Sequence, residues 1–527
     1  MTHVPAPEVS WEETHQSRTV ALNVAGRYGT LAIEILLGLV MLPINTRYLG
    51  ASDYGLWMLA ASVVAYFPVL DLGYGGAMER FVAHYRARRE GAAISELAST
   101  LVFVFAAIGV VAFGVVVVIA WNLGPLFNLD AAQAHTGGFI LQLVAVQFAA
   151  GLPFAIYGAV VNGFQRTFLN SVVGTVVALA VAAVNIGVLL AGGGLIELVG
   201  AMTATRMLGY LAYRHNAYRV YPLLQIRPSL FRLARLREVT RFSVYMLIQD
   251  VANKMNYMTD PMIIAAVLTT GAVAVWTIAQ RLADMVLRLT NQLNEVLFPV
   301  VVDYDTGRHD ARLRELLVQG TRLSLATTLP VVGSMALLAE PVVVGWTGPT
   351  YRPAALVLQI LSVVVLIRVG SSTAATVLRG AGHHRLLALS NMAAALVNIG
   401  LSLLLIRTYG LPGMAVATLI PVTVRAAVVL VPVACSRVGI SLWQFASAAV
   451  WPAAWPAVIG LGALAAVKGS ASASLAHAVG SGALVGLVYG ILFLGLAVGR
   501  EDRIRYLGKL RSITGRPSLN ASVREAT

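Results

Sequence analysis

Charged residues are scarce in this chain of 527 residues, because only 12% are Asp, Glu, Lys or Arg while 58% are hydrophobic. A soluble domain of this length could not bury so much apolar surface, so the composition excludes a soluble globular fold. A lone cysteine, Cys435, excludes a disulfide within the chain. Neither Cys435 nor the nine histidines show metal-site or nucleophile spacing, and a GxxxxGK(S/T) phosphate loop is missing. We therefore expect no metal, no catalytic residue and no direct use of ATP.

Long apolar segments are what the sequence has in abundance. Segments of about 20 residues, enough to cross the hydrocarbon core of a bilayer, recur between residues 22 and 498. Lipid offers no hydrogen-bond partner to the backbone, so such segments must be helices. We predict an all-α polytopic membrane protein with about fourteen transmembrane helices. The predicted spans are 22–46, 54–78, 97–121, 137–161, 170–191, 195–213, 242–267, 273–301, 322–346, 353–377, 387–406, 411–434, 448–467 and 476–498.

Cationic residues are distributed unevenly between the two sides of these spans. Arginines gather in alternate loops, such as 80–89 and 214–241, and in the C-terminal tail, whereas the opposite loops hold few. Cationic loops stay in the cytoplasm, so this pattern predicts that both termini are cytoplasmic. It also accounts for the net charge of +14, and it favours contact with anionic membrane lipids over nucleic acid as a partner. The polar first 20 residues do not resemble a cleavable signal peptide.

The sequence contains an internal repeat. A shift of 219 residues places Trp57 on Trp276, Val82 on Val301, Tyr85 on Tyr304 and Glu96 on Glu315. A shift of 213 residues places the motif VNIG at 184–187 on 397–400, and one small difference in length between the two blocks reconciles both shifts. Six helices return the chain to its starting side, so the first twelve spans are predicted to form two parallel repeats. The expected domains are a cytoplasmic N-tail (1–21), an N-terminal six-helix bundle with an inner linker (22–241), a C-terminal six-helix bundle (242–447), two additional helices (448–498) and a basic cytoplasmic tail (499–527).

Several predicted spans carry polar stripes, although a charge at the bilayer centre costs about 2.5–3.5 kcal/mol. In the span 273–301 the polar residues fall within about 100° of arc. We interpret the stripes as the lining of a water-filled cavity between the repeats; the alternative is pairing between helices that serves only packing. The cavity cations would be Arg27, Lys254, Arg281, Arg288 and Arg368, the carboxylates Glu34, Asp71, Asp250, Asp260, Asp284 and Glu295, and the uncharged polar residues Asn253, Tyr257, Asn291 and Gln292.

Two prolines occupy similar positions in the two repeats. Pro43 and Pro261 each lie near the outer end of the first helix of a repeat, one residue out of register under the 219-residue shift. A proline inside a helix frees a backbone carbonyl and permits a bend. We expect both helices to bend during gating, with a tolerated kink as the alternative.

Three stretches of the sequence have a recognisable order of residues: RYLGASDYGLW, LDLGYGGAMERFVAHY and LRGAGHHRLLALSNMAAALVNIGLSLLLIRTYGLPGMAVATLI. They resemble the bacterial polysaccharide (oligosaccharide-lipid) flippases, a branch of the multidrug/oligosaccharidyl-lipid/polysaccharide exporter superfamily. The resemblance extends from about residue 20 to about residue 500. It implies two six-helix bundles that work by alternating access. It also implies a substrate such as an undecaprenyl-diphosphate-linked oligosaccharide, moved from the cytoplasmic to the outer leaflet.

The predicted cavity suits such a substrate. A diphosphate that carries sugars needs cations and hydrogen-bond donors, which the predicted cavity cations could supply. The carboxylates could partner those cations, bind sugar hydroxyls or take a coupling H⁺ or Na⁺, and the sequence does not choose among these roles. No other cofactor is expected. The expected partners are the lipid-linked oligosaccharide and membrane lipids, with other polysaccharide-assembly membrane proteins as further candidates.

Other functions stay open at this point. A drug/organic-cation antiporter or a lipid II flippase of the same superfamily would share the architecture. The antiporter should line its cavity with acids and aromatics, whereas cations here are about as frequent as carboxylates. A membrane glycosyltransferase or polymerase usually holds its acceptor with a large outer loop, and the longest predicted outer loop is only 122–136. We therefore predict a transporter of the bacterial cytoplasmic membrane and not an enzyme.

Overall fold

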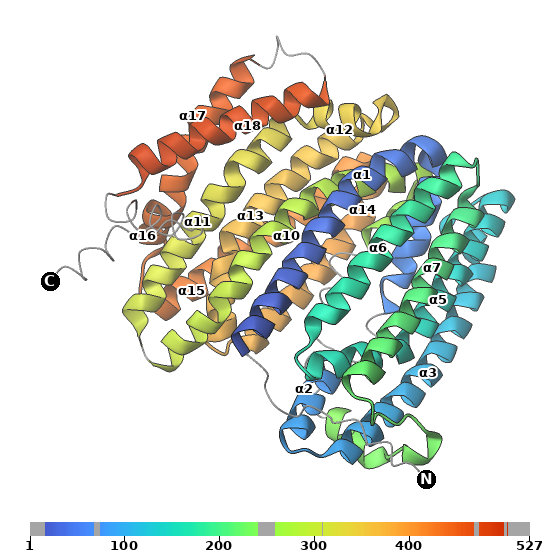
Figure 1. Ribbon diagram of the computed structural model, residues 1–527. Helices are drawn as coiled ribbons and strands as arrows, with labels where there is room; N and C mark the ends of the chain where they lie inside the picture. Colours follow the sequence, from blue (N-terminus) through green and yellow to red (C-terminus); the bar gives the residue numbers. More distant parts are fainter. Residues whose placement is uncertain are drawn as a thin grey trace. The chain divides into compact units, whose positions relative to one another are not determined.

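A computed structural model describes residues 16–67, 74–240, 259–307, 309–467, 474–499 and 503, and all regular structure in these ranges is helical (Figure 1). The prediction of an all-α protein is confirmed. The α-helices are α1 (Gln16–Val64), α2 (Tyr74–Ala87), α3 (Gly91–Trp121), α4 (Leu123–Phe127), α5 (Ala131–Gly163), α6 (Thr167–Leu190), α7 (Leu195–Val220), α9 (Asp260–Val267), α10 (Thr270–Thr306), α11 (Asp310–Leu337), α12 (Ala339–Thr347), α13 (Ala354–Gly380), α14 (His384–Val424), α15 (Val431–Val438), α16 (Leu442–Phe445), α17 (Trp451–Val467) and α18 (Leu475–Leu492). Short 3₁₀ turns lie at Pro228–Leu230 and Pro349–Tyr351, and π-helical segments at Arg425–Leu430, Ala446–Val450 and Phe493–Ala497.

Within the described ranges, nine helices are long and apolar enough to cross a membrane, or up to ten if α11 and α12, bent by 75°, form one span. Two helical stretches contain a sharp corner at a glycine: α1 turns at Gly50 (φ 75°) and α14 at Gly410 (φ 60°). Positive φ favours glycine, and both corners fall between two predicted spans. Helix α10 covers the predicted span 273–301 but is not among the nine, because its polar stripe lowers its hydropathy. The count of fourteen spans stays a prediction.

The described chain divides into two compact units. The first contains the residues up to Ile278 together with Asn391–Met414, and the second contains Ala279–Ser390 with the residues from Ala415 onward. The predicted boundary between the two six-helix bundles, at residues 241 and 242, lies outside the described residues. The division into domains therefore stays a prediction.

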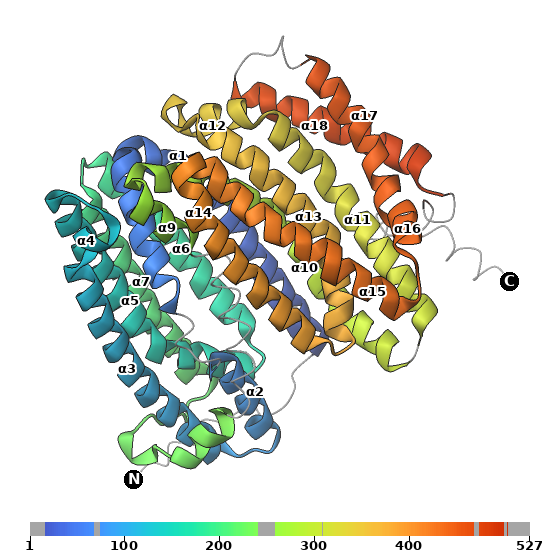
Figure 2. The same cartoon turned by 180° about the vertical axis from the view of Figure 1, so that it is seen from behind.

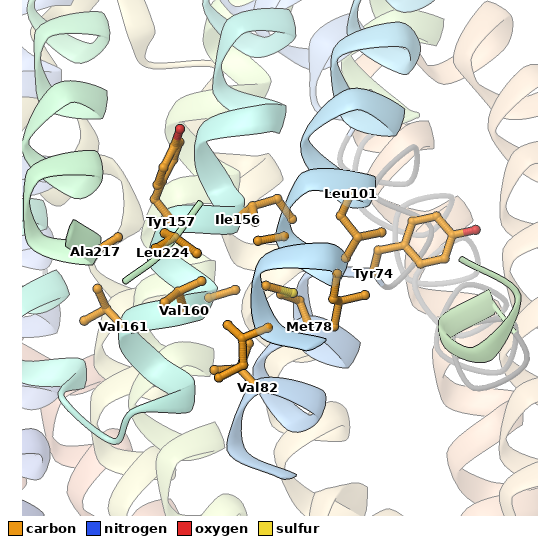
Figure 3. Packing of buried hydrophobic residues seen from close by; sticks show 14 of the residues in the cluster. Tyr74, Met78, Val82, Leu101, Ile156, Tyr157, Val160, Val161, Ala217 and Leu224 are labelled. Atoms are coloured by element: carbon orange, nitrogen blue, oxygen red, sulfur yellow. The ribbon is translucent and has the colours of Figure 1, made fainter. Parts of the chain in front are cut away.

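The first unit is built around α5. This helix packs against α2, α3 and α7, while α1 packs against α6. Figure 3 shows the buried cluster where α2, α3 and α5 meet, with Tyr74, Met78, Val82, Leu101, Ile156 and Val160 among its members. Leu224, which follows α7, is also buried in this cluster. The segment after α7 is therefore part of the core.

The second unit is organised by α11, which packs against α13, α17 and α18 (Figure 2). Helices α17 and α18 cover the predicted additional spans. Arg322 of α11 donates hydrogen bonds from Nε and Nη2 to the carbonyl oxygen of Ala448, at 2.9 and 2.7 Å. Ala448 lies in a π-helical segment, where the α-helical hydrogen-bond ladder is interrupted. Arg322 therefore ties the helices after residue 441 to the bundle through a backbone group.

The sequence repeat reappears as a repeated contact. In the first unit a Cβ on Gly163 would lie 2.5 Å from Val82 Cγ1, and in the second a Cβ on Gly380 would collide with Val301. Val82 and Val301 are equated by the 219-residue shift, and both are fully buried. Each glycine thus lets the end of one helix approach a valine that occupies the same position in its repeat.

The segment between α7 and the predicted seventh span forms a strap, residues 221–240, across the start of α3. Three of its backbone amides donate to α3 hydroxyls: Gln225 N to Ser95 Oγ (3.2 Å), Arg227 N to Ser99 Oγ (3.1 Å) and Arg232 N to Thr100 Oγ1 (3.0 Å). A backbone amide outside regular structure needs such a partner when it is covered by protein. The polar start of α3 therefore holds the strap in place.

Arg235 closes the strap with a cluster of side chains. Its Nε donates to Glu96 Oε2 at 3.2 Å and its Nη1 to the Tyr85 hydroxyl at 3.1 Å, while that hydroxyl donates to Glu238 Oε2 at 3.0 Å. Burial raises the pKa of Tyr85, and the hydrogen bond to Glu238 raises it further. The hydroxyl therefore stays protonated and remains a donor at neutral pH.

The repeated glycine contact predicts the effect of adding one methyl group. Gly163→Ala should lower the free energy of unfolding by about 1–3 kcal/mol, because the new Cβ would overlap Val82. Gly187→Ala is the matched control, since a Cβ there meets nothing within 4 Å. Thermal unfolding in detergent measures the difference. Equal midpoints for both variants would contradict the contact.

The strap predicts that Arg235 protects backbone amides at a distance from its own side chain. Arg235→Gln should speed hydrogen exchange at Gln225, Arg227 and Arg232, because the charge-assisted bonds to Glu96 are lost. Arg237→Gln, an exposed neighbour, should leave exchange unchanged. Hydrogen–deuterium exchange with mass spectrometry resolves these amides. Equal exchange in the two variants would show that Arg235 does not hold the strap.

Candidate substrate-binding site

The predicted site residues are described to different degrees. Asp71, Asp250, Asn253, Lys254 and Tyr257 lie outside the described residues, as do the side chains of Arg27, Asn291, Gln292 and Glu295. The roles predicted for these residues stay predictions. Described side chains are those of Glu34, Asp260, Arg281, Asp284, Arg288, Arg368 and the two prolines.

The second unit brings four of the predicted site residues together. Asp284 of α10 interacts electrostatically with Arg281 and Arg288 of the same helix and with Arg368 of α13. Residues three and four positions apart are neighbours on a helix surface, so Arg281, Asp284 and Arg288 share one face. The electrostatic interaction with Arg368 indicates that this face of α10 is turned toward α13. We call these four residues the arginine cluster.

The charge of the arginine cluster is positive. Among its described side chains, three guanidinium groups accompany one carboxylate, and Asp284, Arg281 and Arg368 are half-buried while Arg288 is exposed. Guanidinium groups bind carboxylate and phosphate through paired hydrogen bonds. The cluster can therefore hold an anionic group beside Asp284.

Helix α1 also carries polar residues along one side, among them Asn23, Thr30 and Glu34, and they have a different use. Asn23 Oδ1 accepts from the Phe168 backbone amide at 2.9 Å, and the Thr30 hydroxyl lies 2.9 Å from the Thr175 hydroxyl. These contacts attach α1 to α6, so packing accounts for this part of the stripe. Glu34, farther along α1, is exposed.

Asp260 is buried at the start of α9, with only 4% of its surface exposed. The neighbouring Thr259 hydroxyl forms a hydrogen bond with the Tyr66 hydroxyl, and Tyr66 also interacts electrostatically with Asp260. Neither Tyr66 nor Thr259 was predicted from the sequence as a neighbour of Asp260. A tyrosine five residues before Asp71 in an apolar run was the available signal for Tyr66.

The two predicted gating prolines lie in different local settings. Pro43 lies within α1, where a proline removes a hydrogen bond of the helix ladder. Pro261 lies in the first turn of α9, where the missing N–H has no partner to lose. The local reason for a bend is therefore stronger at Pro43, and the role of both prolines in gating stays a prediction.

The arginine cluster predicts a charge-compensation effect. Asp284→Asn should destabilise the protein by less than the about 3–5 kcal/mol of a fully buried broken ion pair, because Asp284 is only half-buried. Adding Arg368→Gln should restore part of the loss, since it removes one cation from the cluster. Asp303→Asn, at an exposed position of α10, is the control. Thermal unfolding midpoints in detergent measure the stability of each variant. A double variant less stable than Asp284→Asn would contradict the arrangement.

Comparisons with known proteins agree with this architecture. The succinoglycan biosynthesis transport protein ExoT of Rhizobium meliloti (strain 1021) is 22% identical over 377 residues, which are 70% of each chain. Among solved structures, the lipid II flippase MurJ in an inward closed conformation has a TM-score of 0.70 at 14% identity, covering 90% of this chain and 98% of its own. An inward-facing multidrug resistance MATE family transporter of the MOP superfamily has a TM-score of 0.63 at 14% identity, covering 77% and 98%.

The structural likenesses show the fold, because their sequence identities are low. The family is shown by the sequence itself, since residues 29–304, about half of the chain, match the family model described as "Polysaccharide biosynthesis protein". The resemblance noted in the sequence is thereby confirmed. The chain belongs to the polysaccharide biosynthesis protein family of multi-pass membrane proteins, and it has the fold of the MOP superfamily transporters.

Proposed function

We propose that the protein is a flippase that moves a polyprenyl-diphosphate-linked oligosaccharide across the cytoplasmic membrane by alternating access, for the synthesis of a surface polysaccharide. The arginine cluster is the observation that carries this proposal. A diphosphate must exchange its hydration shell for other donors when it enters the membrane. Three guanidinium groups that interact with one carboxylate offer such donors, and guanidinium groups bind phosphate through paired hydrogen bonds.

The relatives support the same class of function. One is named for transport in succinoglycan biosynthesis and another for flipping lipid II. Both names describe transport, so we propose a transporter without catalytic residues. Lipid-linked saccharide and membrane lipids are the proposed partners, together with other polysaccharide-assembly membrane proteins. The proposed location is the bacterial inner membrane with both termini in the cytoplasm.

Energy for transport would come from a coupling H⁺ or Na⁺. Asp284 and Asp260 are the described carboxylates that suit this role, because both lie on predicted spans and are at least half-buried. A carboxylate beside arginines can bind and release a cation as an anionic substrate arrives and leaves, since each changes the local charge. No further cofactor is proposed.

The proposal predicts the phenotype of a strain that lacks this protein. Organic extracts should contain an accumulated polyprenyl-diphosphate oligosaccharide by mass spectrometry, and surface polysaccharide should be lost. The wild-type gene should restore the polymer, whereas Arg281→Ala and Arg288→Ala should not, although both variants insert stably. Arg352→Ala, whose exposed guanidinium pairs with Glu340 at 2.8 Å, should restore it as the control.

Two outcomes would overturn the proposal. Normal polymer in cells that carry both Arg281→Ala and Arg288→Ala would refute the assignment of the arginine cluster. Normal glycolipids combined with new sensitivity to cationic drugs would indicate a drug/organic-cation antiporter instead.

A further inference from the structure

A fourth arginine lies on the same pair of helices as the three arginines of the arginine cluster. Arg379 of α13 places its guanidinium over the ring of Phe298 of α10, 4.6 Å from the ring centroid. Both side chains are half-buried. Such a guanidinium is attracted to the negative face of the ring, and its N–H groups can still point outward along the plane. Phe298 therefore fixes the orientation of Arg379 without using its hydrogen-bond donors.

Arg379 continues the face of α13 that carries Arg368. The two residues are eleven positions apart, which is close to three helical turns and about 16 Å along the axis. On α10 the corresponding partners are Asp284 and Phe298, separated by about 21 Å. Because Arg368 faces Asp284 and Arg379 faces Phe298, the two helices run in the same direction and present a common seam.

On the α13 side of the seam, small side chains lie between the two arginines. Ser372 and Ala375 are the residues of α13 that lie on this face, and both are half-buried. Beyond Arg379, Gly380 packs on Val301, so the seam ends at the side of the unit where the arginine-rich loops are predicted to be cytoplasmic.

We propose that Arg379, oriented by Phe298, is a second diphosphate-binding position, at the cytoplasmic end of the α10–α13 seam. The inference rests on the proposed function, since it assigns a first docking point to the same lipid-linked diphosphate. The diphosphate would meet Arg379 at the membrane surface and then move about 16 Å along the seam to the arginine cluster. Two cationic positions of this kind lower the cost of bringing an anion into the membrane, because the diphosphate is never far from a guanidinium.

Binding of farnesyl diphosphate, a short polyprenyl diphosphate, tests the proposal. Native mass spectrometry of the full-length protein gives apparent affinities, with farnesol as the uncharged comparison. Arg379→Gln should weaken farnesyl diphosphate binding at least about tenfold, as expected for a lost charged hydrogen bond, and leave farnesol binding unchanged. Arg385→Gln, an exposed arginine of the same loop region, is the matched control and should bind both ligands as the wild type does.

Phe298 is a positioning residue, and its variants separate orientation from packing. Phe298→Leu should weaken farnesyl diphosphate binding, because the guanidinium loses its ring, whereas Phe298→Tyr should retain it. The double variant Phe298→Leu with Arg379→Gln should bind farnesyl diphosphate no more weakly than Arg379→Gln alone. Both changes act on the same contact between Arg379 and Phe298, so their effects should not add. Thermal midpoints confirm that each variant is folded.

The outcomes distinguish this inference from the proposed function. If Arg281→Ala loses farnesyl diphosphate binding while Arg379→Gln behaves like Arg385→Gln, the cytoplasmic position is refuted and the flippase proposal survives. If Arg281→Ala also binds normally, the arginine cluster itself is not the site. Equal loss of farnesol and farnesyl diphosphate in Arg379→Gln would mean that the change disturbs packing, and it too would refute the position.

Discussion

Hydrocarbon cannot hydrogen-bond to a peptide group, and the described architecture follows from this constraint. The described chain satisfies most of its backbone inside long helices, and some departures from them have a local explanation. The corners at Gly50 and Gly410 use the residue that tolerates positive φ. Near Ala448 the hydrogen bonds of the helix are interrupted, and Arg322 donates two hydrogen bonds to the Ala448 carbonyl oxygen. These irregular points thus have two different causes, the backbone freedom of glycine and a side chain that hydrogen-bonds to a backbone carbonyl.

The same constraint explains why charge in the membrane is informative. Arg281, Asp284, Arg288 and Arg368 stand together on two helices, where each charge alone would be costly. A hydrophobic pair of similar volume would pack as well and cost less. This positive cluster is the part of the described chain on which the proposed binding of an anionic lipid headgroup depends.

Residue spacing predicted much of the fold and one part of the site. Long apolar runs predicted the helices because their length alone is diagnostic, and the three- and four-residue spacing of Arg281, Asp284 and Arg288 predicted a shared face. The use of Asn23 and Thr30 was not predictable, because a polar stripe does not reveal which helix it faces. The bond from Arg322 to Ala448 depends on a backbone irregularity, which residue types do not encode.

The strap limits the distance that the connection between the two repeats can span. A free segment of residues 221–240 could span about 70 Å when extended. Its amides are fixed to the hydroxyls of α3 and its apolar residues Tyr221, Leu224 and Val239 are buried, so this length is not available as a loose tether. Residues 221–240 therefore add no reach to the connection between the two repeats, because their length is taken up by packing on α3.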